Sequence, residues 1–78
     1  MPTVMQIEGY RFFFVSMDRD EPPHIHIKRE KMVAKIWLDP VVLERTGGFS
    51  RVEINKIIKM VLSHREYLLD KWNEFFER

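Results

Sequence analysis

The sequence contains no cysteine, so disulfide bonds and thiolate metal sites are both excluded. It has no apolar run approaching the roughly 20 residues that span a bilayer, so we expect no membrane association. The net charge is only +1, and attraction to a nucleic acid must therefore come from a local patch of charge. The start of the chain lacks a charged segment followed by an apolar one, so we expect no signal peptide and a cytoplasmic location.

What the chain does contain is typical of one small folded domain spanning residues 1–78. Apolar residues make up 45% of the sequence and charged residues 32%, which argues against disorder. Six Phe, two Tyr and two Trp are present, and aromatic rings bury a large area each, which helps a short chain to form a core. We predict an α+β domain with a strand-rich part at 3–40, a connecting segment at 41–49 and a helix at 50–76.

Short segments in the first half predict a small antiparallel sheet of three to four strands. Aromatic and β-branched residues are concentrated in them, and two of them, HIHIK and MVAKIWL, alternate in character along the chain. The polar segment between the second and third strands ends in two prolines and must be a loop. Residues 41–45 are ambiguous between a short helical turn and an extended segment. The predicted strands cover residues 3–7, 10–16, 24–28 and 32–38.

The helix has a well-defined start. Ser50 is a favoured N-cap, and Glu53 three residues later completes a capping box. Phe49 can pack on Ile54 as a hydrophobic staple. No Pro or Gly follows, and apolar residues recur every three or four positions, so the sequence predicts one long helix packed against the sheet.

A continuous helix of this length would extend beyond its sheet. It would be about 40 Å long at about 1.5 Å per residue, whereas a strand of five to seven residues spans only about 17–23 Å. Trp72, Phe75 and Phe76 would then need another partner, which makes them a candidate interface for a cognate small protein or for a second copy in a dimer. The alternative is that the helix bends or breaks and packs them into its own core.

One face of the third and fourth strands carries the candidate functional residues. His24, His26 and Lys28 share one side of their strand. A two-residue turn would place His26 opposite Lys35 and His24 opposite Trp37. Histidines can serve as general acid and base near neutral pH, which makes His24 and His26 the candidate catalytic pair. Lys28, Lys35 and Trp37 are candidate ligand or nucleic-acid contacts, because lysines bind phosphates and an indole can stack on a base. The alternative is an ordinary solvated face.

No metal or cofactor is assigned from the sequence. Two histidines at i and i+2 can chelate one ion, but they fall short of a full set of four spaced ligands. The sequence also lacks a glycine-rich phosphate loop, a nucleophile elbow and a cysteine nucleophile. Four carboxylates are candidates for a third metal ligand, namely Asp18, Asp20, Glu21 and Asp39.

The chain resembles the bacterial domain of unknown function 4160 family over nearly its whole length. The most specific strings are EPPHIH at 21–26 and AKIWLDP at 34–40. MPT at 1–3, IEGYRFFF at 7–14, GFS at 48–50, HRE at 64–66 and Trp72-Asn73 also match. Family members often have Gly in the turn after the third strand, where this chain has Arg29-Glu30-Lys31.

The resemblance implies a component of a toxin–antitoxin-like module. Genes of this family often lie beside another small gene, which implies a partner protein and an RNA-directed toxic activity of RNA binding or RNA cleavage. It supplies no established catalytic residues, so whether the chain is an enzyme stays open. The alternative is a non-enzymatic interaction module that docks a partner or a second copy through its C-terminal helix.

Overall fold

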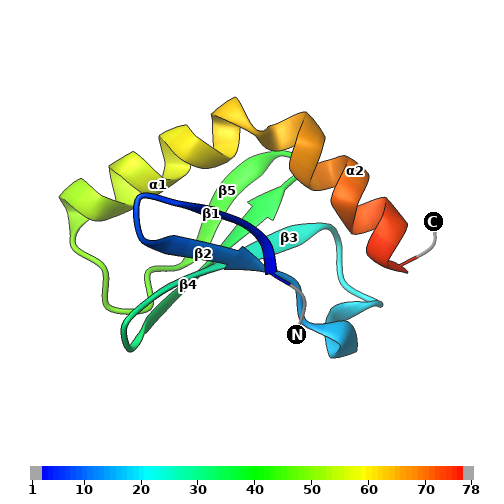
Figure 1. Cartoon of the computed structure of the whole chain (residues 1–78), viewed down its shortest axis with the longest axis horizontal. Coiled ribbons are helices and arrows are strands. Elements are labelled where there is room, and N and C mark those ends of the chain that lie inside the picture. Colours follow the sequence, from blue (N-terminus) through cyan, green and yellow to red (C-terminus); the bar gives the residue numbers. More distant parts are fainter. Residues whose placement is uncertain (1–2, 77–78) are drawn as a thin grey trace.

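Each short apolar segment in the first half of the chain forms a strand, and successive strands pair in sequence order. The computed structural model describes residues 3–76. Its five-stranded antiparallel sheet has the order β1-β2-β3-β4-β5, and both helices lie on one face of that sheet (Figure 1). The elements are β1 (Thr3–Ile7), β2 (Tyr10–Phe13), the 3-10 turn η1 (Ser16–Asp18), β3 (His24–Arg29), β4 (Met32–Leu38), β5 (Val41–Arg45), α1 (Arg51–Ser63) and α2 (Arg65–Phe76).

The sheet has one strand more than the three to four that the sequence predicts. The first half of the predicted connecting segment 41–49 is β5, which pairs with β4. Val41 lies opposite Leu38, and Leu43 lies opposite Ile36. These pairs extend the apolar surface beneath the helices, which favours the extended form of a segment that was ambiguous from its sequence. β2 ends at Phe13 and is shorter than the predicted 10–16.

The hairpin formed by β3 and β4 has the predicted register. His24 pairs with Trp37, and His26 pairs with Lys35. The turn has two residues although neither is Gly or Asn, and Glu30 adopts a left-handed φ of 56°. The alternating apolar pattern on both strands therefore determines the register even where the turn residues are unfavourable.

The C-terminal third of the chain forms two helices, and the prediction of one long helix was wrong. α1 ends at Ser63, and His64 has non-helical dihedral angles of φ −115° and ψ 17°. The His64 backbone N–H donates to the carbonyls of Met60 at 3.1 Å and Val61 at 3.2 Å. Its ring Nδ1 also donates to the Met60 carbonyl at 2.9 Å. The last turn of α1 is thus capped without Gly or Pro, which is why the sequence gives no sign of the break.

Arg65 fixes the break against the sheet. Its Nε donates to the Leu38 carbonyl at 2.9 Å, and its Nη2 lies 2.7 Å from Asp39 Oδ1. After the break α2 stays over the sheet, and it packs Trp72 (0% exposed) and Phe76 (5% exposed) into the core. The chain itself therefore covers the aromatic residues that a straight helix would have left without a partner.

The core lies between the sheet and the two helices. Alternate residues of β2, β3 and β4 face the helices, as period-two alternation requires. The helices contribute residues spaced three and four apart. The side chains buried there are Tyr10, Phe12, Phe14, Ile25, Ile27, Ala34, Ile36, Leu38, Phe49, Ile54, Ile57, Met60, Val61, Leu68, Trp72 and Phe76.

The outer sides of both helices carry mainly charged and polar residues, although Val52, Leu62 and Tyr67 are also exposed. Arg51 and Lys59 on α1 are exposed, as are Glu66 and Asp70 on α2. Within residues 3–76, neither helix combines the length and the apolar character that a membrane span requires.

The turn between β5 and α1 requires glycine at one position. Gly47 has φ +64°, and a Cβ built there would lie 1.9 Å from the carbonyl oxygen of Val33. A side chain would therefore clash with the β4 backbone as well as strain its own backbone. The N-cap that follows is the predicted one, because the Glu53 N–H donates to Ser50 Oγ at 3.2 Å.

Candidate functional site

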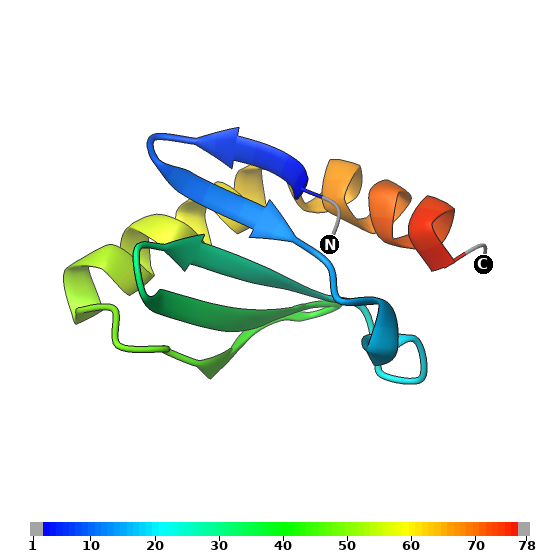
Figure 2. The same cartoon turned by 60° about the horizontal axis from the view of Figure 1, so that its bottom comes forward.

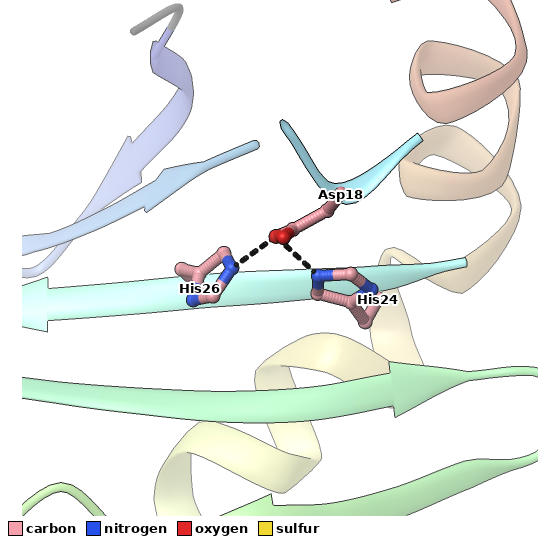
Figure 3. A group of neighbouring side chains, drawn as sticks. All are labelled: Asp18, His24 and His26. Atoms are coloured by element: carbon pink, nitrogen blue, oxygen red, sulfur yellow. Dashed lines mark hydrogen bonds and ion pairs between the residues drawn. The ribbon is translucent and has the colours of Figure 1, made fainter. Parts of the chain in front are cut away.

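Asp18, His24 and His26 converge (Figure 3) at the end of the sheet where β2 ends and β3 begins, the end beside which Figure 2 shows the η1 turn. The two histidines are alternate residues of β3, so both rings point to the same side of that strand. Asp18 is the last residue of η1, and its backbone N–H donates to the Val15 carbonyl at 3.0 Å. The loop that the sequence predicts as a connector therefore also carries a side chain to the histidine pair.

His24 is fully buried and hydrogen-bonded at both ring nitrogens. Nδ1 lies 2.9 Å from the Pro22 carbonyl oxygen, and Nε2 lies 2.7 Å from Asp18 Oδ2. Its side chain has an exposed fraction of 0%. The rings of Trp37 and Trp72 lie 5.3 and 5.1 Å away, measured between centroids. His24 is therefore held rigidly and cannot reach a macromolecule in solvent.

His26 is slightly more accessible. Its Nε2 lies 2.9 Å from the same Asp18 oxygen, and its side chain is 11% exposed. The ring stacks on Phe13 with centroids 5.3 Å apart. Burial lowers the pKa of His26 below its ordinary value, and the hydrogen bond with Asp18 opposes this shift without cancelling it. We therefore expect neutral imidazole at His26 near neutral pH, with Nε2 carrying the proton that it donates to Asp18.

One carboxylate oxygen of Asp18, Oδ2, is hydrogen-bonded to both histidines. Partial burial on its own would raise the pKa of Asp18. The hydrogen bonds from His26 and His24, together with the attraction of their charged forms, outweigh burial and lower that pKa. Asp18 is therefore ionised near neutral pH and supplies the negative charge of the cluster.

The three residues form a potential metal-ligand set. One nitrogen from each histidine and one oxygen from Asp18 lie within 4.8 Å of one another. From the sequence, Asp18 was one of four carboxylates that could complete a site with the histidines. Asp18 rather than another of these carboxylates lies beside the histidines because of the path of η1. The alternating pattern of the strands does not predict that path.

The predicted contact residues share the face of the sheet opposite the helices, but they differ in accessibility. Lys28 is exposed and Trp37 is partly buried. The Lys35 side chain is only 13% exposed, and its Nζ lies 2.7 Å from Glu21 Oε1 and 4.8 Å from the Trp37 ring centroid. Its charge is therefore largely neutralised by a carboxylate that the sequence does not identify as its partner.

Two further cations occupy this face and were missed from the sequence. Arg11 pairs with Lys28 across β2 and β3, and Arg45 pairs with Lys35 across β4 and β5. The signal for Arg11 was present, because it alternates with the core residues Tyr10 and Phe12. Arg45 could not be placed without knowing that 41–45 is a strand. We call this surface the helix-free face; its residues are Arg11, Phe13, His26, Lys28, Lys35, Trp37 and Arg45.

The three residues predicted as a partner interface do not form one continuous surface. Trp72 and Phe76 are buried, and only Phe75 is partly exposed. Phe75 lines a groove of about 370 Å³ whose other walls come from β1, from Phe14 just after β2, and from the rest of α2. The other lining residues are Thr3, Val4, Phe14, Tyr67, Lys71 and Glu74.

Comparison with known proteins gives one finding about relationship. The model of a family described as "Domain of unknown function (DUF4160)" matches residues 9–73, which include all three residues of the cluster and both helices up to Asn73. No match is found among curated proteins or among solved structures.

Proposed function

The chain belongs to the DUF4160 family, and we propose that it binds single-stranded RNA through the helix-free face of its sheet, as one component of a toxin–antitoxin-like module. The observation that carries the proposal is the distribution of cations. Arg11, Lys28 and Arg45 lie on the one sheet face that no helix covers. The net charge of the whole chain is only +1, so this local concentration of positive charge is the feature suited to a polyanion.

These three cations are available to a ligand. Within residues 3–76, none of them forms an ion pair with a carboxylate. Arg11 lies over the Phe13 ring at 4.9 Å from its centroid, which orients the guanidinium and leaves its charge uncompensated. Lys35 is already paired with Glu21, so we assign it a supporting role beside Trp37.

Trp37 provides an aromatic surface among the cations. It pairs with His24 on one side and with Val42 on the other, and Val42 is 49% exposed. Bases of a single strand stack on such side chains for about 1–3 kcal/mol each, while the cations follow the phosphates. A partly exposed indole beside unpaired cations favours a single strand, whose bases are free to stack, over a duplex.

The geometry favours RNA binding over cleavage by the two histidines alone. General acid–base catalysis requires a hydrogen-bonding distance between the imidazole and the reacting group. His24 is 0% exposed, and both of its nitrogens are occupied. We therefore propose Arg11, Lys28, Arg45 and Trp37 as the RNA contacts and give the histidines no direct contact with the phosphate.

The test is fluorescence anisotropy with a labelled single-stranded RNA. Arg11→Glu/Lys28→Glu should weaken binding by roughly tenfold or more. The slope of log K against log salt concentration should become shallower by about 0.7 for each phosphate contact that is lost. The matched control is Arg51→Glu/Lys59→Glu, which makes the same charge change on exposed positions of α1, on the other side of the molecule. Equal loss in both double variants would show non-specific attraction and refute the assigned face.

The module is tested by growth of a bacterial host after inducing this protein alone. We expect growth arrest by the wild type and relief by Arg11→Glu/Lys28→Glu, provided that circular dichroism shows the variant to be folded. The physical reason is that an RNA-directed effect requires the phosphate contacts. If the folded variant still arrests growth, the toxicity does not depend on the helix-free face.

A further inference from the structure

We propose that Asp18, His24 and His26 bind one divalent transition-metal ion through one carboxylate oxygen and two imidazole nitrogens. The inference goes beyond RNA binding and does not rest on it. Its first support is convergence: Asp18 Oδ2 lies 2.7 Å from His24 Nε2 and 2.9 Å from His26 Nε2. An ion with bonds of about 2.1 Å holds neighbouring ligand atoms about 3 Å apart when they subtend a right angle. The Asp18 oxygen thus already lies at this spacing from both imidazole nitrogens, and all three ligand atoms lie within 4.8 Å of one another.

The hydrogen bonds of His24 give the second support. Its Nδ1 faces the Pro22 carbonyl, which can only accept, so Nδ1 carries a proton. Nε2 faces the Asp18 carboxylate, which when ionised can also only accept, so a cation must lie between these two atoms at 2.7 Å. In metal-free protein that cation is the Nε2 proton of the hydrogen bond described above. A proton would join two of the three converging atoms, whereas a metal ion would bind all three.

The Pro22 contact is also the kind of support that metal-binding histidines have. Such histidines donate their second ring N–H to a carbonyl or carboxylate, which fixes the tautomer and orients the ring. His24 has this partner in a main-chain carbonyl two residues earlier in the sequence. The ring is further held by Trp37 and Trp72, with centroids 5.3 and 5.1 Å away. The ligand is therefore positioned by its surroundings before any ion arrives.

The donor atoms and the charge indicate which class of ion fits. Imidazole nitrogen with one carboxylate suits Zn²⁺, Fe²⁺, Mn²⁺ and their neighbours, whereas Ca²⁺ and Mg²⁺ prefer oxygen ligands alone. A metal ion binds imidazole in its neutral form, and two such imidazoles with one carboxylate provide a formal charge of −1, which favours a cation. The nearby Lys35 does not oppose this strongly, because Glu21 neutralises it at 2.7 Å.

Three protein ligands leave coordination positions for water or for a small oxygen ligand. This is the arrangement of catalytic rather than structural metal sites. The side chains of Asp18 and His26 are 17% and 11% exposed, so the open positions lie toward solvent on their side of the cluster. His24 closes the opposite side at 0% exposure. The proposed ion would therefore be reached by small molecules and would be protected from the bulk of a macromolecule.

The experiment uses the full chain stripped with chelator and then titrated separately with Zn²⁺, Mn²⁺ and Co²⁺. We expect one equivalent of metal by native mass spectrometry, and visible d–d absorption on adding Co²⁺. The ¹⁵N signals of His24 and His26 should shift on adding Zn²⁺, while those of His64 stay in place. His64 is an internal control because its Nδ1 is engaged by the Met60 carbonyl on α1.

Variants separate a specific site from metal adsorbed on surface histidines. Asp18→Asn retains size and one oxygen, and it should raise the metal Kd at least tenfold. His26→Gln is the second variant, to be used if Asp18→Asn does not fold. His64→Gln should leave the Kd unchanged. Failure of the wild type to take up any of the three ions would overturn the proposal, as would wild-type affinity in both folded site variants.

Discussion

Replacement of Asp18 by Ala removes the acceptor on which two histidines depend, and its cost can be worked from their burial. His24 Nε2 lies on a side chain with no exposure to solvent and loses Asp18, its one partner at that atom within residues 3–76, which costs about 1–3 kcal/mol. His26 is 11% exposed, so water can partly replace Asp18 there and the loss is smaller, about 1 kcal/mol. We expect the free energy of unfolding to fall by about 3 kcal/mol in metal-free protein.

The assay is urea unfolding at neutral pH with chelator present, followed by tryptophan fluorescence. A loss of about 3 kcal/mol corresponds to a Tm lowered by roughly 12–24 °C for a domain of this size. Asp18→Asn should cost less than Asp18→Ala, because the amide retains an oxygen acceptor at the same position. The matched control is Asp20→Ala, an exposed carboxylate in the same loop, which should change stability by no more than about 0.5 kcal/mol.

The reasoning fails if Asp18→Ala unfolds within about 0.5 kcal/mol of Asp20→Ala. That result would mean that water or a rearranged loop satisfies His24 as well as Asp18 does. The cluster would then be a soft surface feature, and the rigid positioning invoked for metal binding would lose its basis.

Three further predictions concern the fold and its pH dependence. Gly47→Ala should lower the free energy of unfolding in urea by more than about 3 kcal/mol, because its Cβ would lie 1.9 Å from the Val33 carbonyl oxygen of β4. The control Gly9→Ala should lower it by only about 1 kcal/mol, because a Cβ there meets no atom within 4 Å and the cost comes from its φ of +84° alone. Equal effects would refute the steric argument. Arg65→Ala should lower the free energy of unfolding by about 1–2 kcal/mol, since it removes hydrogen bonds of 2.9 and 2.7 Å to Leu38 and Asp39. The backbone amides of α2 should then exchange with solvent hydrogen faster than those of α1. An equal increase along both helices would contradict the anchoring role of Arg65. Metal-free protein should lose stability as pH falls below 6.5, because burial lowers the pKa of His26 in the folded state and the unfolded chain binds that proton more readily. The lowered pKa of Asp18 acts in the same direction at pH values below 3.8. A stability that rises as the pH falls below 6.5 would contradict the His26 assignment, and one that rises as the pH falls below 3.8 would contradict the Asp18 assignment.

The β3–β4 hairpin and the start of α1 could be predicted because each depends on local patterns. Alternation along HIHIK and MVAKIWL determines which side chains face the core, and a one-residue slip would have exposed Ile25 and Ile36. Ser50 and Glu53 identify the helix start because their bond spans only three residues. In both places the decisive contact is short in sequence or repeated by a pattern.

The break at His64 and the identity of the third cluster member depend on contacts distant in sequence. No Pro or Gly marks the break, and Arg65 stabilises it through residues 26 and 27 positions earlier. Asp18 reaches the histidines because η1 directs the loop over β3, a path that a polar segment with two prolines does not specify. The burial of His24 was missed for the same reason, since period two correctly places it away from the main core and says nothing of what else covers it.

The break in the helix and the histidine cluster are parts of one arrangement. The His24 ring lies beside both Trp37 on β4 and Trp72 on α2, with ring centroids 5.3 and 5.1 Å away. Trp72 reaches this position because α2 starts anew after His64 and stays over the sheet. A helix continuing straight from α1 would carry Trp72 away and leave His24 open on that side. Trp72, which on sequence grounds was a candidate for contact with a partner, therefore serves to cover His24.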